Sequence, residues 1–539
     1  MRKNLSAITG MVTHTATHAP EADPAITGLA FDSRDVTAGS LFFALPGTHT
    51  TGNKFIADAV RAGAAAVVYE GELDPDAERA LAESGAAGIK VDSARFSMSP
   101  IAAAFFDFPS RRLITIGVTG TEGKSSTVSF IWQLLRLCGK KAGFISTVQY
   151  STGGGAVDNP QHQTTPEAPI VQSQLADMAR NGCEYAVVES SSHGLSPRTN
   201  RLGDVLFDAG IMMNVAHEHL EFHGTWEQYR DDKANLFRAL LKHNHEKIIC
   251  GNKIAVRPFA VINADDPSAG YFAGALAGNP GCGVYGFSAQ LSVTGGKAPD
   301  GLAALCVARD ISATEEGISF NAKDSSAGEF FVNAPLPGSF NAANLLASII
   351  AVSNLTGIPA EDVARKTGEL LPVRGRMTRV VCGQDFEVIV DYAHTPSSFN
   401  VIFPAIRARA KGKIVCLFGS GGERDTAKRP EQGKIAARFC DIVILSDEDP
   451  RGEDPAELLK MIEAGCVAEG KIPGKDVLVI PDRPLAIRKA FSLAQKNDIV
   501  LLLGKSHENS IIYKDFVMPY DEFAEAKKAL AELGYGDMP

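Results

Sequence analysis

The chain has 539 residues, 45% hydrophobic and 22% charged, a composition typical of a soluble protein with several folded domains. Its 63 acidic residues outnumber its 53 lysines and arginines, and the net charge of −10 argues against non-specific binding to nucleic acid or to an anionic membrane surface. The nine cysteines form no CxxC pair, and neither a secretory leader nor a run of about 18 apolar residues is present, so we expect a cytoplasmic protein without membrane insertion.

Short apolar segments alternate with a helix-like segment in the first part of the chain. They read LFFAL at 41–45, KFIADAVRAGA at 54–64 and AAAVVYE at 64–70. Proline and charge break this pattern in DFPSRR at 107–112. We therefore predict a first α/β domain over residues 1–108.

The next apolar run, LITIGVTG at 113–120, precedes a Gly-rich loop and the helix-like segment 124–139, which is the order that a phosphate-binding loop needs. Further strand candidates at 185–190, 247–250 and 258–266 alternate with helices and predict a mainly parallel sheet. Shorter β-like runs follow, and we predict a central domain over 109–337.

Four apolar strands then end in polar or Gly-rich loops. They are FEVIVDYAH, KIVCLFGSGG, DIVILSDEDP and DIVLLLGKSHE. This pattern predicts a second doubly wound α/β domain over 338–539, with ligands at the carboxyl ends of its strands. The expected fold class is thus α/β, with an N-terminal α/β domain, a central domain of the P-loop ATPase type and a Rossmann-like C-terminal domain.

The loop GVTGTEGKSSTV departs by one residue from the P-loop pattern G-x-x-x-x-G-K-[ST], because Val118 stands where the first glycine would be. Gly120 and Gly123 allow backbone N–H groups to approach phosphate oxygens at a helix N-terminus. Lys124 can reach the β- and γ-phosphates, and Ser125 can hold magnesium. The alternative is an ordinary glycine-rich turn, but TGTEGKSS between a strand and a helix favours nucleotide binding.

Two further groups point to a metal. Glu189 ends the strand YAVVES, where a carboxylate beside a P-loop suits Mg²⁺, although it can also be a surface acid. NVAHEHLEFHG places His217, His219 and His223 within seven residues, which allows a zinc site as an alternative. The neighbouring glutamates and the lack of nearby cysteines make zinc the weaker choice.

In their order and spacing, these motifs resemble those of the Mur ligase family, the ATP-dependent amide-forming enzymes of peptidoglycan precursor synthesis. TGTEGKSS resembles the family's T-G-T-x-G-K-[ST]-[ST], ESSSH its E-x-S-S-H, and NVAHEHLEFHG its N-x-x-x-D-H-L-[DE]-x-H-G with Glu218 replacing aspartate. VINADDP, LPGSFNAANLLA, VDYAHTP and FGSGGERDTAKRP follow in the family's order, and FDSRDVTAGSLFFALPG resembles its UDP-sugar domain. The resemblance covers almost the whole chain.

QTTP, DYAHTP, SDEDPR and GKSHE look most like the members that act on a diamino acid. The resemblance therefore implies a ligase that uses ATP and Mg²⁺ to join lysine, ornithine or meso-diaminopimelate to UDP-N-acetylmuramoyl-L-alanyl-D-glutamate through an acyl phosphate. We expect a monomer. The same resemblance implies catalytic roles for Lys124, Glu189, His219 and Lys233, and metal binding by Ser125, Glu189, His219 and Lys233. Lys233 lies 14 residues after His219, where the family's carbamylated lysine falls, but it can also be a solvated helix lysine.

The resemblance also assigns the substrate contacts. The implied ATP-binding residues are Gly120, Thr121, Glu122, Gly123, Lys124, Ser125, Ser126, Asn341, Asn344, Arg376, Asp391 and His394. The implied UDP-substrate residues are Phe31, Ser33, Thr48, His49, Thr50, Thr164, Thr165, Ser191 and Arg201. Arg198 competes with Arg201, because SPRTNR is two residues longer than the family pattern. Packing or helix capping is the alternative role for the residues outside the loop.

The incoming amino acid is expected to contact Arg424, Glu448, Asp449, Pro450, Arg451, Gly504 and Glu508. Diaminopimelate-adding members typically carry D-N-P-R and G-K-G-H-E, where this chain has Asp449 and Ser506 at the asparagine and the middle glycine. Arg451 suits the second carboxylate of diaminopimelate, whereas Asp449 would repel it by about 4 kcal/mol at about 4 Å and an effective dielectric near 20. The choice stays open, and we lean towards lysine or ornithine.

Two other functions compete. One is a different ligase of the superfamily, either another Mur ligase or a folylpolyglutamate synthetase-like enzyme, against which the DPR loop, GKSHE and the UDP-type N-terminal segment argue. The other is an ATP-driven binding protein without transfer chemistry, which gives no reason for DYAHTP in a separate domain.

Overall fold

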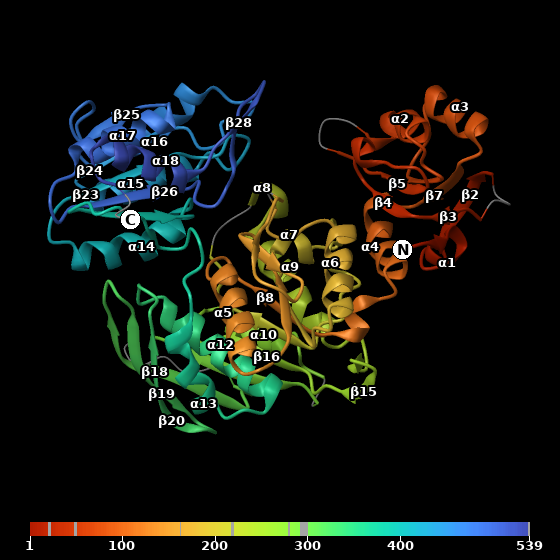
Figure 1. The fold of residues 1–539 in the computed structure, drawn as a ribbon, viewed down its shortest axis with the longest axis horizontal. Coiled ribbons are helices and arrows are strands. Elements are labelled where there is room, and N and C mark those ends of the chain that lie inside the picture. Colours follow the sequence, from red (N-terminus) through yellow and green to blue (C-terminus); the bar gives the residue numbers. More distant parts are fainter. Residues whose placement is uncertain are drawn as a thin grey trace.

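The structure is a computed structural model that describes residues 1–19, 23–47, 51–161, 163–216, 220–278, 281–290 and 300–536, with the side chains of residues 220 and 221 left aside. Three sheet-centred units follow one another along the chain: the red, the orange-to-green and the blue parts of Figure 1. Each unit combines a sheet with helices, so the predicted α/β class is confirmed.

The N-terminal unit is built on a five-stranded sheet, counted over the described residues, with strand order β2-β7-β6-β5-β4. Its elements are β1 (Lys3–Asn4), α1 (Leu5–Thr9), β2 (His14–His18), β3 (Ala25–Ile26), β4 (Gly28–Ala30), β5 (Ser40–Ala44), α2 (Ile56–Arg61), β6 (Ala66–Tyr69), α3 (Pro75–Ser84), β7 (Ala87–Val91) and α4 (Ala94–Phe105). All residues of β5 and β6 are buried, because helices cover both faces of this mostly parallel sheet.

The central unit holds a sheet of eleven strands in the part of the chain that is described, ordered β11-β10-β9-β12-β8-β13-β16-β17-β18-β19-β20. These strands are β8 (Ile114–Thr119), β9 (Ala142–Ile145), β10 (Gln149–Ser151), β11 (Val157–Asp158), β12 (Tyr185–Glu189), β13 (Ala209–Met212), β16 (Phe259–Asn263), β17 (Gly283–Ser288), β18 (Ala304–Ala313), β19 (Ile318–Asp324) and β20 (Gly328–Ala334). The run from β9 to β18 is parallel, as predicted, and β18–β20 add an antiparallel meander. The strand candidate at 247–250 was wrongly assigned to this sheet, because it forms a half-exposed antiparallel hairpin outside it.

Helices cover both faces of the central sheet. They are α5 (Lys124–Leu137), α6 (Ala168–Arg180), α7 (Ser192–Leu195), α8 (Leu220–His223), α9 (Trp226–Ala239), α10 (Ala269–Gly274), α12 (Asn341–Thr356) and α13 (Ala360–Arg365), and a separate hairpin joins β14 (Glu246–Ile249) to β15 (Asn252–Ala255). Gly117 in β8 allows close packing, since a Cβ there would lie 2.3 Å from a methyl carbon of Leu236 in α9. Helix α12 packs against α5 in the same hydrophobic core.

The C-terminal unit has a six-stranded sheet over its described residues, ordered β21-β22-β26-β23-β24-β25. Its elements are β21 (Thr378–Arg379), β22 (Glu387–Asp391), α14 (Pro396–Arg409), β23 (Ile414–Phe418), α15 (Lys428–Phe439), β24 (Ile442–Leu445), α16 (Pro455–Ala468), β25 (Val477–Val479), α17 (Arg483–Leu493), β26 (Ile499–Leu503), β27 (Ser510–Ile512), β28 (Val517–Pro519) and α18 (Glu522–Glu532). The strands β22 to β25 are parallel and wholly or largely apolar, so their carboxyl ends share one edge.

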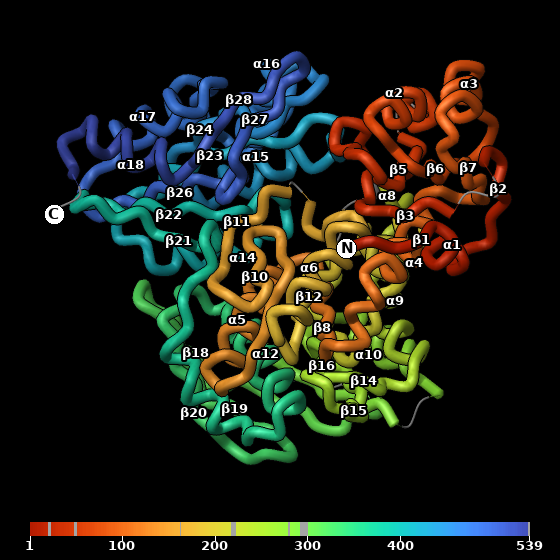
Figure 2. The backbone as a smooth tube through the Cα atoms, turned by 45° about the vertical axis from the view of Figure 1, so that its right-hand side comes forward, coloured from red at the N-terminus to blue at the C-terminus, as the bar shows by residue number. Residues whose placement is uncertain are grey.

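Polar contacts join the three units. Arg95 of the N-terminal unit pairs with Glu167 of the central unit at 3.2 Å. On the other side, Arg374 reaches Asp158 of β11 at 2.8 Å and Asp521 beside α18 at 3.0 Å. Figure 2 shows the C-terminal unit lying over β10 and β11 of the central unit, which is consistent with these pairs.

Candidate active site

The phosphate-type loop lies between β8 and α5, at the carboxyl edge of the central sheet. Gly123 has φ +82°, and a Cβ at that position would lie 2.6 Å from the Asn344 side-chain oxygen, so glycine is required there. Asn214 Oδ1 accepts hydrogen bonds from the N–H groups of Thr121 and Glu122 at 3.0 and 2.8 Å, which fixes the loop. Lys124 Nζ donates to the Thr121 carbonyl at 2.7 Å.

Ser125 and Glu189 meet beside this loop. Because β12 pairs in parallel with β8, Glu189 lies opposite Val118, and its Oε1 accepts from Ser125 Oγ at 2.9 Å. Its Oε2 accepts from the Thr147 N–H at 2.8 Å, and the carboxylate is buried. A hydroxyl and a carboxylate side by side are the hard oxygen donors that magnesium prefers, so these residues fit the ion expected from the sequence. His219 lies outside the described residues.

Lys233 reaches the same loop from α9. Its side chain is buried, its Nζ donates to the Gly120 carbonyl at 2.6 Å, and it lies 4.4 Å from the centre of the Tyr229 ring. It is not a solvated helix lysine. The structure thus brings Lys124, Ser125, Glu189 and Lys233 around one loop.

A pocket of about 270 Å³ lies beside the start of α5. Its lining residues are Ser126, Phe130, Leu336, Pro337, Phe340, Asn341, Pro372, Val373 and Arg376. Asn341 Nδ2 donates to the Pro337 carbonyl at 2.8 Å, and Asn344 Nδ2 donates to Asn341 Oδ1 at 3.0 Å. Asn341 lines the pocket and Asn344 is bonded to it. An asparagine at such a pocket next to a phosphate-type loop offers both a donor and an acceptor to a nucleotide base.

The C-terminal unit supplies the other nucleotide candidates. Arg376 Nη2 donates to Ser125 Oγ at 3.1 Å, so this arginine reaches across to the loop. Asp391 is buried and accepts from two backbone N–H groups, those of Met377 and Ala393; burial raises the pKa of its carboxyl group although Arg376 opposes that shift. His394 Nδ1 bonds the Tyr392 carbonyl at 2.7 Å.

The loop also touches the C-terminal unit directly. Glu122 Oε1 accepts from the hydroxyls of Thr395 and Ser397 at 3.2 and 3.3 Å, at the start of α14. The carboxyl edges of the central and C-terminal sheets therefore face each other.

Thr165 and Ser191 lie on the other side of Glu189. Thr165 Oγ1 donates to the Glu189 carbonyl at 2.9 Å and accepts from the Ser191 N–H at 3.0 Å. Arg201 Nη1 donates to the Thr165 carbonyl at 2.9 Å, and Arg201 pairs with Glu167. Of the two competing arginines, Arg201 is therefore the one beside Thr165.

The remaining candidates for the UDP substrate make other contacts or lie in the N-terminal unit. Arg198 Nη1 instead donates to the Phe222 carbonyl at 2.6 Å, and Thr164 is half-buried next to Thr165. Phe31 and Ser33 follow β4 in the N-terminal unit and are half-buried. Thr48, His49 and Thr50 lie outside the described residues.

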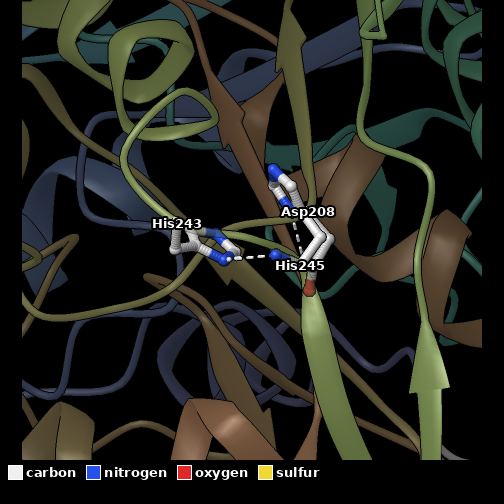
Figure 3. Close-up of side chains that lie close together, drawn as sticks. All are labelled: Asp208, His243 and His245. Atoms are coloured by element: carbon white, nitrogen blue, oxygen red, sulfur yellow. Dashed lines mark hydrogen bonds and ion pairs between the residues drawn. The ribbon is translucent and has the colours of Figure 1, made fainter.

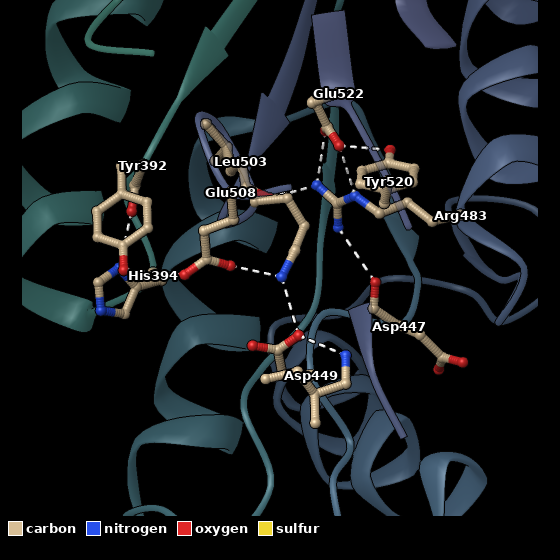
Figure 4. A network of polar contacts seen from close by, with 11 residues as sticks. Tyr392, His394, Asp447, Asp449, Arg483, Leu503, Glu508, Tyr520 and Glu522 are labelled. Atoms are coloured by element: carbon tan, nitrogen blue, oxygen red, sulfur yellow. Dashed lines mark hydrogen bonds and ion pairs between the residues drawn. The ribbon is translucent and has the colours of Figure 1, made fainter. Parts of the chain in front are cut away.

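The expected amino-acid site is formed by loops after β24 and β26 (Figure 4). Lys505 Nζ pairs with Asp449 Oδ1 at 2.9 Å and with Glu508 Oε2 at 2.5 Å, and Tyr392 Oη donates to Glu508 Oε1 at 3.2 Å. Burial disfavours the Lys505 ammonium, but Glu508 and Asp449 outweigh that effect and the pKa of Lys505 is raised.

Glu448, Pro450, Arg451 and Gly504 border this network. Glu448 is buried against Gly504, and burial raises the pKa of its carboxyl group against the opposing charges of Lys428 and Lys505. The Pro450 carbonyl packs against Gly422, and the Arg451 backbone adopts φ +54° and donates its N–H to the Ile512 carbonyl. Arg424 is exposed on the loop after β23.

A second pocket, of about 290 Å³, lies between the central and C-terminal units. Its lining residues are Thr147, Asn159, Gln161, Tyr392, His507, Glu508 and Asn509. Thr147 is the residue whose N–H holds Glu189, so this pocket separates the magnesium-type carboxylate from the expected amino-acid site.

Lys505, Tyr392 and Glu167 were not singled out from the sequence. Lys505 stands inside GKSHE, directly after an apolar strand. A lysine at a strand end, in a domain whose SDEDPR and GKSHE segments carry acidic residues, could have been recognised as an ion-pair partner. Glu167 follows QTTP, but nothing local predicts that it pairs with arginines from two different units.

A second titratable cluster, Asp208, His243 and His245, lies at the opposite edge of the central sheet, since Asp208 precedes β13 (Figure 3). Its spacing would admit a metal ion. However, Lys247 Nζ lies 2.8 Å from Asp208 Oδ2, and His245 Nε2 already bonds the Leu240 carbonyl at 2.8 Å. A lysine ammonium on the carboxylate argues against a cation there, and the cluster fits a buried structural network.

Comparison with known proteins identifies the family. Family models match residues 25–106 (Mur ligase family, catalytic domain), 118–352 (Mur ligase middle domain) and 375–506 (Mur ligase, glutamate ligase domain). A Treponema denticola protein named UDP-N-acetylmuramyl-tripeptide synthetase is 53% identical over 520 residues, which cover 94% of each chain. A Geobacillus kaustophilus protein named UDP-N-acetylmuramoyl-L-alanyl-D-glutamate--2,6-diaminopimelate ligase is 37% identical over 513 residues, covering 95% of this chain and 96% of that one.

A solved structure of a protein with the latter name is 27% identical and covers 99% of this chain and 100% of its own, with a TM-score of 0.60. A MurF structure from Acinetobacter baumannii shares the fold at 15% identity, with a TM-score of 0.65. No helix in the described part of the chain is long and apolar enough to span a membrane. Matched by these family models and by relatives that are 53% and 37% identical over nearly the whole chain, the chain belongs to the Mur ligase family and is an ATP-dependent ligase.

Proposed function

We propose that this chain joins the amine of a diamino acid to the D-glutamate γ-carboxylate of UDP-N-acetylmuramoyl-L-alanyl-D-glutamate, using ATP, as a cytoplasmic step of peptidoglycan precursor synthesis. The names of the two relatives described above support this choice of substrates. The observation that carries the proposal is the convergence of Lys124, Ser125, Glu189 and Lys233 around one loop. A pocket nearby is lined by Thr147, whose N–H bonds Glu189, and by Glu508 of the expected amino-acid site.

The chemistry begins with an unreactive carboxylate. ATP phosphorylates the γ-carboxylate to an acyl phosphate, the acceptor amine attacks its carbonyl carbon, and phosphate leaves with the bonding electrons. Positioning of the three reactants and neutralisation of the anionic oxygens are the main tasks of the protein. Lys124 is suited to the β- and γ-phosphates, and Arg376 lies close enough to Ser125 to add positive charge from the C-terminal unit.

Magnesium, when bound, offsets the negative charge of the phosphates. Ser125 and Glu189 are the described residues that would hold it, together with His219 and a carbamylated Lys233. As an ammonium, Lys233 would repel a nearby cation, whereas its carbamate supplies an anionic oxygen. Its buried Nζ at the Gly120 carbonyl already lies at the phosphate-type loop.

The UDP-linked substrate would lie along Phe31, Ser33, Thr165, Ser191 and Arg201. The γ-carboxylate must approach Glu189, and Thr165 and Ser191 border that residue. Arg201 forms an ion pair with Glu167, and its guanidinium would attract the anionic dipeptide. We retain a first domain over 1–108 and a monomer as part of this proposal. The boundary between the central and C-terminal domains moves from 337/338 to after Val373, because α12 and α13 pack in the core of the central sheet.

A competition assay tests the proposed reaction. The protein is incubated with ATP, Mg²⁺, the UDP-dipeptide and equimolar lysine, ornithine and diaminopimelate, and the products are identified by mass spectrometry. We expect one UDP-tripeptide to form with one ADP released per amide. If no diamino acid is coupled, the proposed function is wrong.

The loop lysine gives the matched test of the site. We expect Lys124→Met to lower kcat by about a hundredfold or more, because it removes a cation from the anionic transition state. Lys253→Met, at an exposed lysine of β15, is the control and should retain full activity. Equal activity of the two variants would contradict the assignment of this loop.

A further inference from the structure

Ser506 adopts a backbone conformation that L-residues rarely use. Its φ is +49°, and its side chain is buried within the expected amino-acid site. Left-handed backbone at a residue other than glycine persists only where the surroundings hold it. Here one of the contacts that hold it is the hydrogen bond from Ser506 Oγ to the Gly375 carbonyl at 2.7 Å.

Gly375 is shaped to receive this hydroxyl. Its φ is +72°, and a Cβ at that position would lie 1.8 Å from Ser506 Oγ. Its own N–H donates to Thr378 Oγ1 at 2.8 Å. The two left-handed residues therefore interlock, although 131 positions separate them in sequence.

The segment around Gly375 lies between the central and C-terminal units, and we call residues 374–376 the connector. Arg374 pairs with Asp158 of the central unit, and Arg376 donates to Ser125 Oγ at 3.1 Å. Arg376 also stacks over the Tyr392 ring at 4.8 Å. The connector therefore contacts the phosphate-type loop directly.

The segment around Ser506 belongs to the other site. Lys505 pairs with Asp449 and Glu508, and Glu508 accepts from Tyr392. We call residues 504–508 the acceptor loop. The Ser506 hydroxyl is thus a direct bond between the acceptor loop and a connector that is fixed to the nucleotide side.

We propose that Ser506 is a positioning residue that couples the two sites, so that nucleotide binding tightens acceptor binding. A nucleotide bound at the phosphate-type loop restricts the motion of Arg376 and of the neighbouring Gly375 carbonyl. Because Ser506 is hydrogen-bonded to that carbonyl, the acceptor loop also becomes more ordered. The acceptor then binds a loop that is already ordered, so its binding no longer includes the loss of conformational entropy of that loop. This inference rests on the proposed function, because it takes the acceptor loop as the diamino acid site.

The test compares acceptor binding with and without nucleotide. Calorimetry measures the Kd of the diamino acid that the competition assay selects, first on the free protein and then with a saturating non-hydrolysable ATP analogue and Mg²⁺. The wild-type protein should bind the acceptor more tightly with nucleotide. In Ser506→Ala this tightening should fall by about three- to tenfold, the range expected for the loss of one hydrogen bond.

Two variants separate this role from folding. Ser506→Gly suits the left-handed backbone and lacks the hydroxyl, so it should fold well and lose the same coupling as Ser506→Ala. Ser353→Ala removes a serine-to-carbonyl bond of the same 2.7 Å length at the far end of α12, and should keep the wild-type ratio. A purely structural role would lower Tm without changing the ratio.

Each result decides the inference. A ratio of the two Kd values that is unchanged in Ser506→Ala or in Ser506→Gly, in a preparation whose wild type forms the tripeptide, overturns the coupling and leaves the proposed function standing. A wild type that couples no diamino acid overturns the proposed function and this inference with it.

Discussion

At the scale of single residues, Asp449 shows how the structure modifies an argument made from charge alone. From the sequence, Asp449 was expected to repel the second carboxylate of diaminopimelate. In the structure, Lys505 lies 2.9 Å from Asp449 Oδ1 and the Ile512 N–H also donates to that oxygen. Asp449 and Glu508 share one lysine, so the three groups together carry a charge of −1 rather than −2.

This sharing predicts the effect of Asp449→Asn on acceptor choice. The change removes the net negative charge of the network, so we expect kcat/KM for diaminopimelate relative to lysine to rise by about tenfold. Asp454→Asn, which removes a charge nearby but keeps the cap of α16, should leave the ratio unchanged. If the two variants have the same ratio, Asp449 does not read the acceptor.

Glu448 predicts a pH dependence of stability. Burial raises its pKa above the ordinary value of 4.5, while Lys428, Lys505 and Arg483 oppose the shift and Asp449 reinforces it. Above pH 4.5 the unfolded chain loses this proton more readily than the folded chain, so stability falls as pH rises towards the raised pKa, by about 1.4 kcal/mol for each pH unit between the two values.

Glu448→Gln removes this titration. Relative to wild type, the variant should therefore gain thermal stability as the pH rises above 4.5, as measured by Tm at each pH. Glu457→Gln, at a glutamate that is 65% exposed on α16, is the control. A Tm difference between Glu448→Gln and wild type that does not change with pH would count against an elevated Glu448 pKa.

Much of the candidate site could be predicted at this scale because its residues stand at strand ends. Ser125 and Glu189 follow neighbouring parallel strands, so their meeting is a consequence of strand order. The pairing of Lys505 with Asp449, or of Arg376 with Ser125, depends on side-chain directions and on the placement of two sheets, which no local pattern encodes.

At the scale of elements, one histidine joins two short helices, α7 and α8, to the longer helix α9. His223 ends α8, its Nδ1 bonds Asp232 Oδ2 of α9 at 2.7 Å, and its Nε2 bonds Ser192 Oγ of α7 at 3.0 Å. All three side chains are buried. Asp232 precedes Lys233, and Ser192 lies three residues after Glu189, so this relay supports both residues of the proposed metal site.

His223→Ala should therefore act on folding and on metal use. It leaves the buried Ser192 hydroxyl and one buried oxygen of Asp232 without their partner, at an expected cost of about 2 kcal/mol in the free energy of unfolding. We also expect the Mg²⁺ concentration for half-maximal activity to rise, because α7 and α9 lose their common support. His14→Ala, at an exposed histidine of β2, should change neither quantity. A lower Tm with unchanged Mg²⁺ dependence would limit His223 to a structural role.

The parallel strands and the loop before α5 could be predicted because continuous apolar runs ending in glycine-rich segments have few other structures. The relay could not. The histidines of NVAHEHLEFHG raised a zinc alternative, but His223 points into the protein and bonds a serine and an aspartate. That outcome depends on how α7, α8 and α9 pack, which their short sequences do not determine.

At the scale of the whole molecule, the two groups of residues that we propose to contact ATP lie on different units. Lys124 and Ser125 belong to the central unit, whereas Arg376 and Asp391 belong to the connector and the C-terminal unit. The order of the units followed from the motifs. Their mutual placement did not, because polar contacts such as Arg374 with Asp158 leave no hydrophobic pattern in the sequence.

These contacts also predict motion. The Arg374 and Asp158 side chains are 36% and 61% exposed, and such pairs are worth about 1 kcal/mol or less. Polar interfaces of this kind allow domains to move relative to each other. A nucleotide that binds Lys124 and Arg376 together adds contacts only in the closed arrangement, so it shifts the population towards closure.

Small-angle scattering measures this shift. We expect the radius of gyration to fall when a non-hydrolysable ATP analogue, Mg²⁺ and the UDP-dipeptide are added together, and to change less with inorganic phosphate at the same concentration. Lys124→Met should reduce this decrease in the radius of gyration, because it removes one of the two cationic side chains that are expected to contact the nucleotide. An unchanged scattering profile in the wild type with all ligands bound would contradict closure. The two sheets would then already have their working arrangement without ligands, and the Ser125–Arg376 contact would be part of a rigid site.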